Sequence, residues 1–245
     1  MNDYHSPAYA DLFQRHKLDD FEALWALSLT PVDAPNLERG GHSEVCLLTL
    51  ENQRFFVKRQ TNHLGRSVQR PFGEPTFARE FRNIQLFQKR GIPALDAAWF
   101  GERRSGKSWR AILITPALDG HEDLIDLNAR WQTLSNETQH GIIDASATLL
   151  RTLHDSGLLH GSLYAKHVFL TQTPSGWFAR FIDLEKSRPF FRRSAERVRD
   201  LDVFARRLDQ WQENEWQRFF EHYAGPEGPQ WRQKLDARLA RKRKK

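Results

Sequence analysis

The sequence contains little sulfur and no long apolar run. Cys46 is the only cysteine among 245 residues, which excludes an intramolecular disulfide and is typical of a reducing compartment. No run of about 18 apolar residues occurs, so we expect no transmembrane helix. Residues 1–17 have no apolar stretch behind a basic start, so we expect no secretory signal peptide. Together these absences predict a cytoplasmic protein.

Positive charge is concentrated near the C-terminus. The formal net charge is +6, and residues 232–245 hold eight Lys and Arg against one acid, a net of +7, which leaves about −1 for the rest. A protein that coats nucleic acid usually spreads basic charge over a face, so this distribution argues against a nucleic-acid partner. Trp231, Leu235 and Leu239 follow helical spacing and predict a basic amphipathic helix. We favour a helix docked on the preceding domain; the alternative is peripheral contact with an anionic inner membrane.

The order of elements changes from strands to helices along the chain. Apolar residues at helical spacing predict helices over 8–29, 76–90, 135–156, 195–211 and 213–223. Alternating or continuous apolar runs predict strands over 44–51, 53–60, 97–103 and 109–118, and a small hairpin that turns at 174–176. This order predicts an α+β protein with two lobes. We expect a helical extension over 1–37, a strand-rich lobe with one helix over 38–118, a mainly helical lobe over 119–229, and a basic helix or tail over 230–245.

Several residues of the first lobe fit a site that handles phosphate. Lys58 lies in the strand FFVKR, from which its ammonium group can reach phosphate oxygens. Glu80 follows on the predicted helix, and in protein kinases such a glutamate pairs with the strand lysine over the nucleotide. Each of the two alone is more often a solvated charge. Gly40, Gly41 and Ser43 precede the first strand, where their backbone N–H groups would cover ATP phosphates, although the same turn is also an ordinary one.

A histidine-bearing loop and an aspartate follow in the second lobe. LLHGSLYAKHVFL, residues 158–170, matches the kinase catalytic-loop pattern H-x-D-x-x-x-x-N before a strand. His160 aligns with the histidine, Ser162 replaces the aspartate and His167 replaces the asparagine. Asp183 ends the next predicted strand, where kinases hold magnesium. Each residue alone also fits a structural role, but the four elements in this order predict a protein-kinase-like fold that binds ATP and Mg²⁺, with Asp183 and His167 at the metal.

The strings HGSLYAKHVFL and IDLEKSR resemble the lipopolysaccharide kinase family of the Kdo/WaaP type, and most closely its InaA branch. The resemblance covers about residues 38–210. It implies a bacterial ATP-dependent kinase whose acceptor is a sugar or glycolipid hydroxyl, such as lipopolysaccharide core heptose or a similar envelope glycan. A histidine stands at the asparagine position in that family, so His167 is expected there. Asp200 resembles the helix aspartate that braces the kinase catalytic loop; an ordinary N-terminal helix charge is the alternative.

Ser162 departs from this pattern, because heptose-phosphorylating members of the family carry aspartate there. A serine hydroxyl is no general base near neutral pH, and losing that help typically costs about 10²- to 10⁴-fold in rate. Phosphoryl transfer depends mainly on positioning and charge neutralisation, which Lys58, Lys166 and Asp183 with magnesium would supply. Two hypotheses stay open here: a slow or specialised sugar kinase, and a pseudokinase that binds nucleotide or partners without phosphotransfer.

Arginines follow Asp183 in the sequence. They fit either an anionic, phosphate-bearing substrate or a solvated face, and both interpretations stay open. The residues are Arg188, Arg192, Arg193, Arg197 and Arg199.

Overall fold

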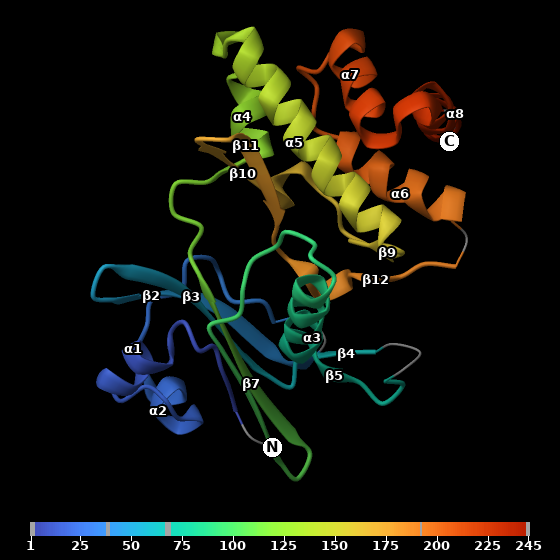
Figure 1. Ribbon diagram of the computed structural model, residues 1–245. Coiled ribbons are helices and arrows are strands. Elements are labelled where there is room, and N and C mark those ends of the chain that lie inside the picture. The colour runs from blue at the N-terminus through green and yellow to red at the C-terminus, as the bar shows by residue number, and fades with distance from the viewer. Residues whose placement is uncertain (1–2, 38–39, 67–69, 192, 244–245) are drawn as a thin grey trace. The chain divides into compact units, whose positions relative to one another are not determined.

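The protein forms two lobes in a computed structural model that describes residues 3–37, 40–66, 70–191 and 193–243. The N-lobe comprises residues up to Leu86 together with Leu95–Asp119, and the C-lobe comprises Phe87–Ala94 together with the chain from Gly120 onward (Figure 1). The N-lobe is built on an antiparallel sheet, and the C-lobe is mainly helical. The predicted α+β class, with a strand-rich first lobe and a helical second lobe, is confirmed.

An antiparallel sheet forms the centre of the N-lobe. Its strands are β1 (Tyr4–His5), β2 (His42–Leu50), β3 (Gln53–Thr61), β6 (Trp99–Ser105) and β7 (Ser108–Pro116). Their order is β1-β6-β7-β3-β2, and a separate pair consists of β4 (Leu64–Gly65) and β5 (Glu74–Pro75). β2 and β3 form the predicted hairpin, in which Glu51 takes a φ of 53° in a two-residue turn. Such turns favour positive φ because their twist then matches that of the strands.

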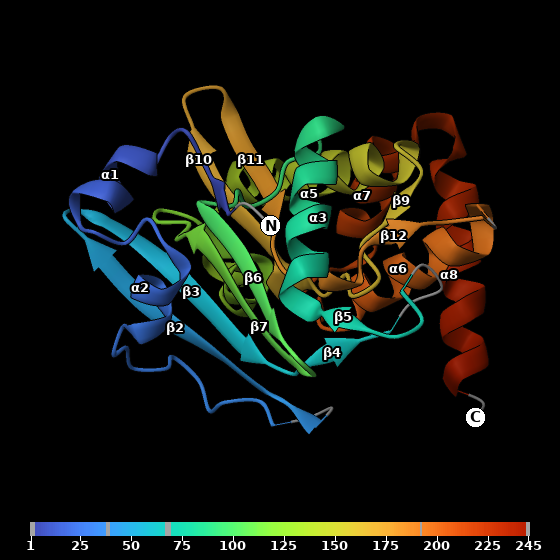
Figure 2. The ribbon, with the colours of Figure 1, turned by 90° about the horizontal axis from the view of Figure 1, so that it is seen from below.

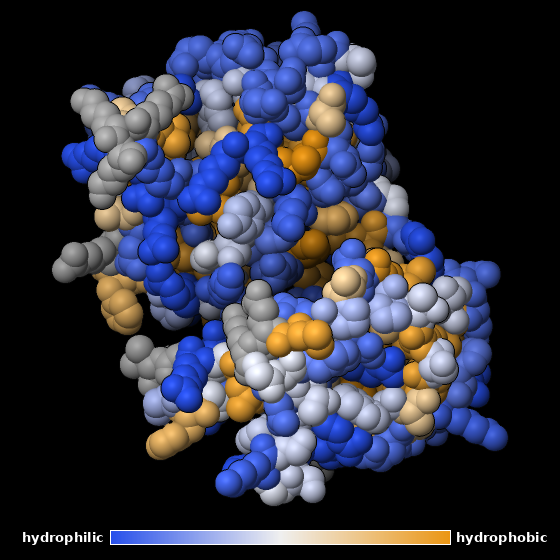
Figure 3. Space-filling model, turned by 180° about the vertical axis from the view of Figure 1, so that it is seen from behind, coloured by the Kyte–Doolittle hydropathy of each residue, from blue (hydrophilic) through white to orange (hydrophobic). Residues whose placement is uncertain are grey.

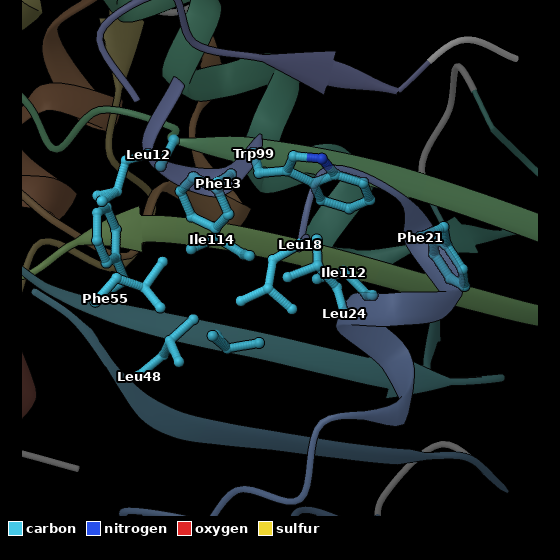
Figure 4. Packing of buried hydrophobic residues seen from close by; sticks show 13 residues of the cluster. Leu12, Phe13, Leu18, Phe21, Leu24, Leu48, Phe55, Trp99, Ile112 and Ile114 are labelled. Atoms are coloured by element: carbon cyan, nitrogen blue, oxygen red, sulfur yellow. The ribbon is translucent and has the colours of Figure 1, made fainter. Parts of the chain in front are cut away.

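The main core of the N-lobe lies between one face of the sheet and two short helices, α1 (Ala10–Arg15) and α2 (Phe21–Ala26). Figure 4 shows Phe13 and Leu24 from these helices together with Phe55, Ile112 and Ile114 from β3 and β7. Residues 3–37, which the sequence predicts as a helical extension, thus supply both an edge strand and much of this core.

The chain turns between α1 and α2, where the sequence predicts one helix over 8–29. Lys17 has a φ of 56°, which a right-handed helix cannot accommodate. Asp20 then starts α2 by accepting hydrogen bonds from the N–H groups of Glu22 and Ala23. The prediction of a single helix is therefore wrong. The turn leaves the apolar faces of both short helices on the same sheet, so the spacing of apolar residues does not reveal it.

Helix α3 (Thr76–Lys89) lies on the opposite face of the sheet from α1 and α2, as Figure 2 shows. Side chains alternate between the two faces along a strand, so Val57 points into the main core while Lys58 points toward α3. Phe81 of α3 stacks on Phe100 of β6 with ring centroids 4.3 Å apart. The helix predicted over 76–90 is confirmed, and it brings Glu80 to the face of the sheet that carries Lys58.

An extended segment pairs with β2, although the sequence does not mark it as a strand. Pro31 bridges Cys46, and Asn36 and Ser43 exchange two backbone hydrogen bonds of 2.8 and 2.9 Å. The connection between this segment and β2 contains Gly40 and Gly41, while residues 38 and 39 lie outside the described residues. The glycine pair therefore joins two adjacent extended segments of the N-lobe.

Helix α5 (Asn136–Asp155) runs through the C-lobe and is fully buried along the stripe that the sequence predicts: Ile142, Ile143, Ala147, Leu150 and Leu153. The other helices are α4 (Leu124–Ala129), α6 (Arg193–Ala205), α7 (Glu213–Ala224) and α8 (Gly228–Arg243). Short 3₁₀ segments are η2 (Trp131–Thr133), η3 (Ala165–His167), η4 (Leu184–Lys186) and η5 (Gly225–Glu227). Ser135 caps α5 by accepting a hydrogen bond from Thr138 N–H.

Short strands of the C-lobe hold the loops that carry the candidate site. They are β8 (Glu122–Asp123), β9 (Leu158–Leu159), β10 (Val168–Thr173), β11 (Gly176–Phe181) and β12 (Arg188–Pro189). β11, β10 and β8 form one sheet in that order, and β9 pairs with β12. The histidine-bearing loop connects β9 to β10, and Asp183 follows β11 directly. The predicted hairpin of the second lobe is therefore confirmed as β10 and β11.

Helix α8 is docked on the C-lobe. Trp231 and Leu235 are buried, Leu239 is half-buried, and the Trp231 ring packs edge-on against Tyr223. Asp202 of α6 adds ion pairs to Arg238 and Lys242 of α8. Burying an aromatic or leucine side chain contributes about 1.5–3 kcal/mol, so the two buried residues anchor the helix. The docked interpretation of the basic segment is confirmed at these positions.

The surface seen in Figure 3 is mostly hydrophilic, with hydrophobic residues in smaller separate patches. In the part of the chain that the structure describes, no helix has both the length and the apolar character needed to cross a membrane.

Candidate functional site

Lys58 and Glu80 form a close ion pair in the N-lobe. The Lys58 Nζ lies 2.6 Å from the Glu80 Oε1, and the two side chains are only 17% and 3% exposed. The pair forms because Lys58 is on the face of β3 that meets α3. An ammonium group held in this way has a fixed position and keeps two N–H donors for phosphate oxygens. The structure thus brings together the two N-lobe charges that the sequence singles out.

Gln60 holds the start of α3 against the same strand. Its side chain is buried, and its Oε1 accepts hydrogen bonds from Thr76 Oγ1 at 3.0 Å and Phe77 N–H at 2.9 Å. Its Nε2 donates to the His63 carbonyl at 2.7 Å. Because Gln60 lies two residues after Lys58, both side chains face α3. Sequence reasoning missed this residue, although strand alternation from Lys58 is a signal that could have found it.

The backbone geometry favours glycine at positions 40 and 41. Gly40 has a φ of 70°, and a Cβ on Gly41 would lie 2.3 Å from the Asn62 carbonyl carbon. Ser43 is part of β2, where its backbone pairs with Asn36. The glycines directly precede the hairpin that carries Lys58 and Ser43 lies within it, and the contact of these three residues with phosphate stays a prediction.

Asp200 of α6 braces the histidine-bearing loop in the C-lobe. Its buried carboxylate accepts hydrogen bonds from His160 N–H at 2.8 Å and Gly161 N–H at 3.2 Å. Gly161 has a φ of 77°, and a Cβ there would lie 2.4 Å from the Lys186 carbonyl oxygen. The loop is therefore fixed by a carboxylate on one side and by close backbone packing on the other. Of the two interpretations of Asp200, the geometry supports the bracing role.

The His160 ring links this loop to the chain just before Asp183. It is fully buried, and its Nε2 lies 2.9 Å from the Ile182 carbonyl oxygen. A carbonyl only accepts, so this nitrogen carries the proton. Burial lowers the pKa of His160, which keeps the ring neutral. His160, which the sequence singles out as catalytic, is fully buried and holds the backbone one residue before Asp183, which is the position of a positioning residue.

Two buried histidines, His154 and His160, make the stability of the C-lobe depend on pH. Burial lowers the pKa of both rings below the ordinary value of 6.5. Below about pH 6.5 the unfolded chain therefore binds protons that the folded chain does not, and the free energy of unfolding falls as the pH falls, by up to about 1.4 kcal/mol per pH unit for each ring. Urea unfolding at about pH 7.5 and about pH 5.5 measures this loss. We expect His154→Gln to reduce the difference; an unchanged difference would contradict a neutral His154.

His167 and Asp183 converge in the C-lobe. The His167 Nδ1 donates to the Ser162 carbonyl at 2.9 Å, so the Nε2 of the neutral ring presents a lone pair. This Nε2 lies 3.4 Å from the Asp183 Oδ2. Asp183 has a φ of 57°, a region that aspartate and asparagine tolerate better than most residues, and its side chain is 46% exposed. The two predicted metal-binding side chains therefore face each other at an accessible position.

These two groups fit a magnesium–nucleotide better than an all-protein metal site. Within residues 3–243, apart from the undescribed positions, no cluster of three or more His, Cys, Asp or Glu side chains could hold a metal ion. Magnesium usually keeps several waters and is held by one or two carboxylates plus substrate phosphates. Asp183 with His167 beside it would hold such an ion, with the nucleotide supplying further oxygens.

Ser162 and Lys166 lie in the same loop but in different surroundings. Ser162 is buried, and its carbonyl accepts from both His167 Nδ1 and Tyr164 N–H. Lys166 belongs to η3, is exposed and lines a surface cavity of the C-lobe. The carboxylate that kinases place at the position of Ser162 is therefore replaced by a hydroxyl in an otherwise well-braced loop.

The arginines after Asp183 are partly engaged in the structure of the C-lobe itself. Arg188 pairs with Glu196 at 2.9 Å, and Arg197 donates to the His154 carbonyl at 2.6 Å. Arg199 is exposed. Arg192 and the side chain of Arg193 lie outside the described residues. The described part of this group therefore favours a structural and solvated role over a common anion site.

A sequence model described as the lipopolysaccharide kinase (Kdo/WaaP) family matches residues 22–223. The chain belongs to this family. The match includes every residue singled out above between Gly40 and Asp183, and it confirms the resemblance that the catalytic-loop string indicates. The family assignment makes kinase activity on lipopolysaccharide core the function to test at this site.

One curated protein and one solved structure are similar to the chain. Protein InaA of Escherichia coli (strain K12) is 30% identical over 210 residues, which cover 84% of this chain and 96% of InaA. A solved structure of WaaP in complex with acyl carrier protein matches with a TM-score of 0.74 at 20% identity, covering 99% of this chain and 98% of that chain. At that identity the structural match shows the kinase-like fold alone.

Proposed function

We propose that the chain is an ATP-dependent kinase that phosphorylates a sugar hydroxyl, with lipopolysaccharide core heptose or a similar envelope glycan as acceptor. The observation that carries the proposal is the convergence of Asp183 and His167 Nε2, 3.4 Å apart, beside a loop that Asp200 braces through two backbone N–H groups. The Asp183 side chain is 46% exposed, so it is accessible to a ligand beside His167. Family membership supports the same reaction class.

Each residue has a defined part in the proposed reaction. Lys58, fixed by Glu80, binds phosphate oxygens of ATP as a point charge. Asp183 and His167 hold magnesium, which supplies charge neutralisation at the phosphates when bound. The transition state of phosphoryl transfer is loose, so this positioning provides most of the rate, and the acceptor proton leaves to solvent because Ser162 cannot take it.

Ser162 is the specific observation that supports a second candidate, a pseudokinase. In this alternative the chain binds nucleotide or a partner through the same residues and transfers no phosphate. Both candidates share the binding of ATP, so binding and transfer must be measured separately.

Magnesium–ATP binding by calorimetry, followed by phosphate transfer to core oligosaccharide, tests the proposal. We expect saturable binding that the double substitution Lys58→Met with Glu80→Gln weakens about 10-fold or more, because charge-assisted hydrogen bonds to phosphate are lost. The paired change leaves no unpaired buried charge. Lys107→Met, on an exposed turn of the N-lobe, is the matched control. Binding without transfer selects the pseudokinase, and equal binding by both variants would contradict the role of Lys58.

We also propose a peripheral contact between α8 and an anionic membrane surface. Docking leaves Lys234 and Arg241 exposed on this helix, and Lys242 is exposed as well although it pairs with Asp202. Cationic side chains near such a surface contribute about 1 kcal/mol each. Co-sedimentation with anionic vesicles, compared with a chain that ends after Leu239, tests this contact.

A further inference from the structure

A cavity of about 510 Å³ opens in the C-lobe beside the histidine-bearing loop. It is lined by Tyr164 and Lys166 of the loop, by Asp123, by Phe204 near the end of α6 and by Arg207 in the turn after that helix. This volume lies within the range of about 300–1,000 Å³ that is typical of small-molecule sites. Because the Tyr164 ring packs against His167, a ligand in this cavity would lie next to the predicted site of phosphate transfer.

The charge of this cavity favours an anion. Lys166 and Arg207 are both exposed, and neither forms an ion pair with any residue that the structure describes. The neighbouring Arg206, by contrast, is directed to the buried Asp202 at 3.6 Å. The acid in the cavity, Asp123, uses its Oδ1 to accept hydrogen bonds from two N–H groups at the start of α4. The cavity thus carries two positive charges and one negative charge, and the negative one already accepts two hydrogen bonds.

The shape and composition of the cavity favour a sugar over a bare ion. The Tyr164 ring is 38% exposed and is fixed edge-on against His167, with ring centroids 5.6 Å apart. Phe204, which also lines the cavity, is fully buried. An aromatic ring offers an apolar face and, in tyrosine, a hydroxyl at its end, which suits a ring with both C–H and O–H groups. A bare phosphate would use the two cations and leave most of the 510 Å³ unfilled.

We propose that this cavity binds a negatively charged group on the sugar acceptor, with Lys166 and Arg207 as its cations and Tyr164 against the sugar ring. That this sugar is the acceptor rests on the proposed kinase function. The acceptor would be a sugar that already carries a phosphate or a carboxylate near the hydroxyl to be phosphorylated. It places Lys166 at the acceptor and not at the transferred phosphate. A charged guanidinium and ammonium in a half-enclosed site bind such an anion through charge-assisted hydrogen bonds.

Binding of monosaccharides without ATP tests the cavity independently of any turnover. The probes are a hexose phosphate, a hexuronic acid, the neutral hexose and inorganic phosphate, each titrated into the full chain by NMR or calorimetry. We expect at least one charged sugar to bind more tightly than both the neutral hexose and inorganic phosphate. The two charged probes distinguish a phosphate-bearing from a carboxylate-bearing acceptor. No binding of either charged sugar, or binding of inorganic phosphate as tight as that of the sugars, overturns the proposal.

Arg207→Gln and Arg206→Gln form a matched pair of variants. Both arginines are exposed and adjacent, but only Arg207 lines the cavity. We expect Arg207→Gln to weaken binding of the charged sugar about 10-fold or more, and Arg206→Gln to leave it unchanged. Equal affinity in the two variants, with unchanged melting temperature, overturns the assignment.

The two proposals fail in different ways. If the charged sugar binds through Arg207 and no phosphate is transferred, the cavity is supported as a sugar site and the kinase function is contradicted. If phosphate is transferred and the acceptor KM is the same in Arg207→Gln and wild type, the kinase function is supported and the assignment of the cavity to the acceptor is contradicted.

Discussion

Replacing Asp183 with asparagine is expected to lower phosphate transfer to core oligosaccharide by about 10³-fold or more. The change removes the only full negative charge of the Asp183–His167 pair, and metal-assisted charge neutralisation contributes several kcal/mol, where each 1.4 kcal/mol is about tenfold in rate. Asparagine is the sharper variant because it tolerates the φ of 57° at this position better than alanine does. The initial rate of ADP release with acceptor measures the effect, and Asp183→Ala is expected to abolish transfer as well.

Asp96→Ala is the matched control for Asp183. Asp96 is exposed in the N-lobe and forms no ion pair with a residue that the structure describes. We expect the wild-type rate from this variant. Equal rates for the wild-type chain and both Asp183 variants would mean that the observed turnover does not arise at this site.

Replacing Ser162 with aspartate is expected to raise the transfer rate by about 10²- to 10⁴-fold, because a general base is restored to a loop already in place. Asp200 holds the preceding backbone N–H groups, and His167 holds the Ser162 carbonyl at 2.9 Å, so the side chain is attached to a fixed backbone. The kcat with saturating ATP and acceptor measures the gain.

Ser162→Asn separates the charge from the size of the new side chain. It is expected to give no gain, since an amide cannot accept the acceptor proton near neutral pH. Equal kcat values for the aspartate and asparagine variants would show that a missing base is not what limits the wild-type chain. Activity that appears only in Ser162→Asp would identify the wild-type chain as a nucleotide-binding pseudokinase.

The parts of the site that could be predicted from the sequence are those set by local pattern. Periodicity places Lys58 on a strand and Glu80 on the helix that follows, and the structure pairs the two at 2.6 Å. The other part is one continuous stretch of sequence. It runs from His160 through His167 to the strand that ends before Asp183, so residue spacing is enough to predict the order of these elements.

What the sequence did not predict depends on contacts between distant segments. Gln60 acts through a helix that begins 16 residues later, and polar strand residues are common. Arg207 belongs to the cavity only because the turn after α6 lies near the histidine-bearing loop. The break between α1 and α2 arises from one left-handed residue, Lys17, which has no sequence signature of its own. The metal-binding and nucleotide-binding assignments stay predictions, since they concern groups brought by ligands.

The double attachment of α3 to β3 has a consequence for control of the N-lobe. Lys58 and Gln60, two residues apart on one strand, hold α3 at Glu80 and at Thr76 with Phe77, a buried ion pair and two hydrogen bonds. Rotating the helix outward would break the Lys58–Glu80 ion pair and both hydrogen bonds to Gln60 together. Two attachment points on one strand favour a single position of α3, so we expect Lys58 to be held in place for a ligand without a partner that moves the helix.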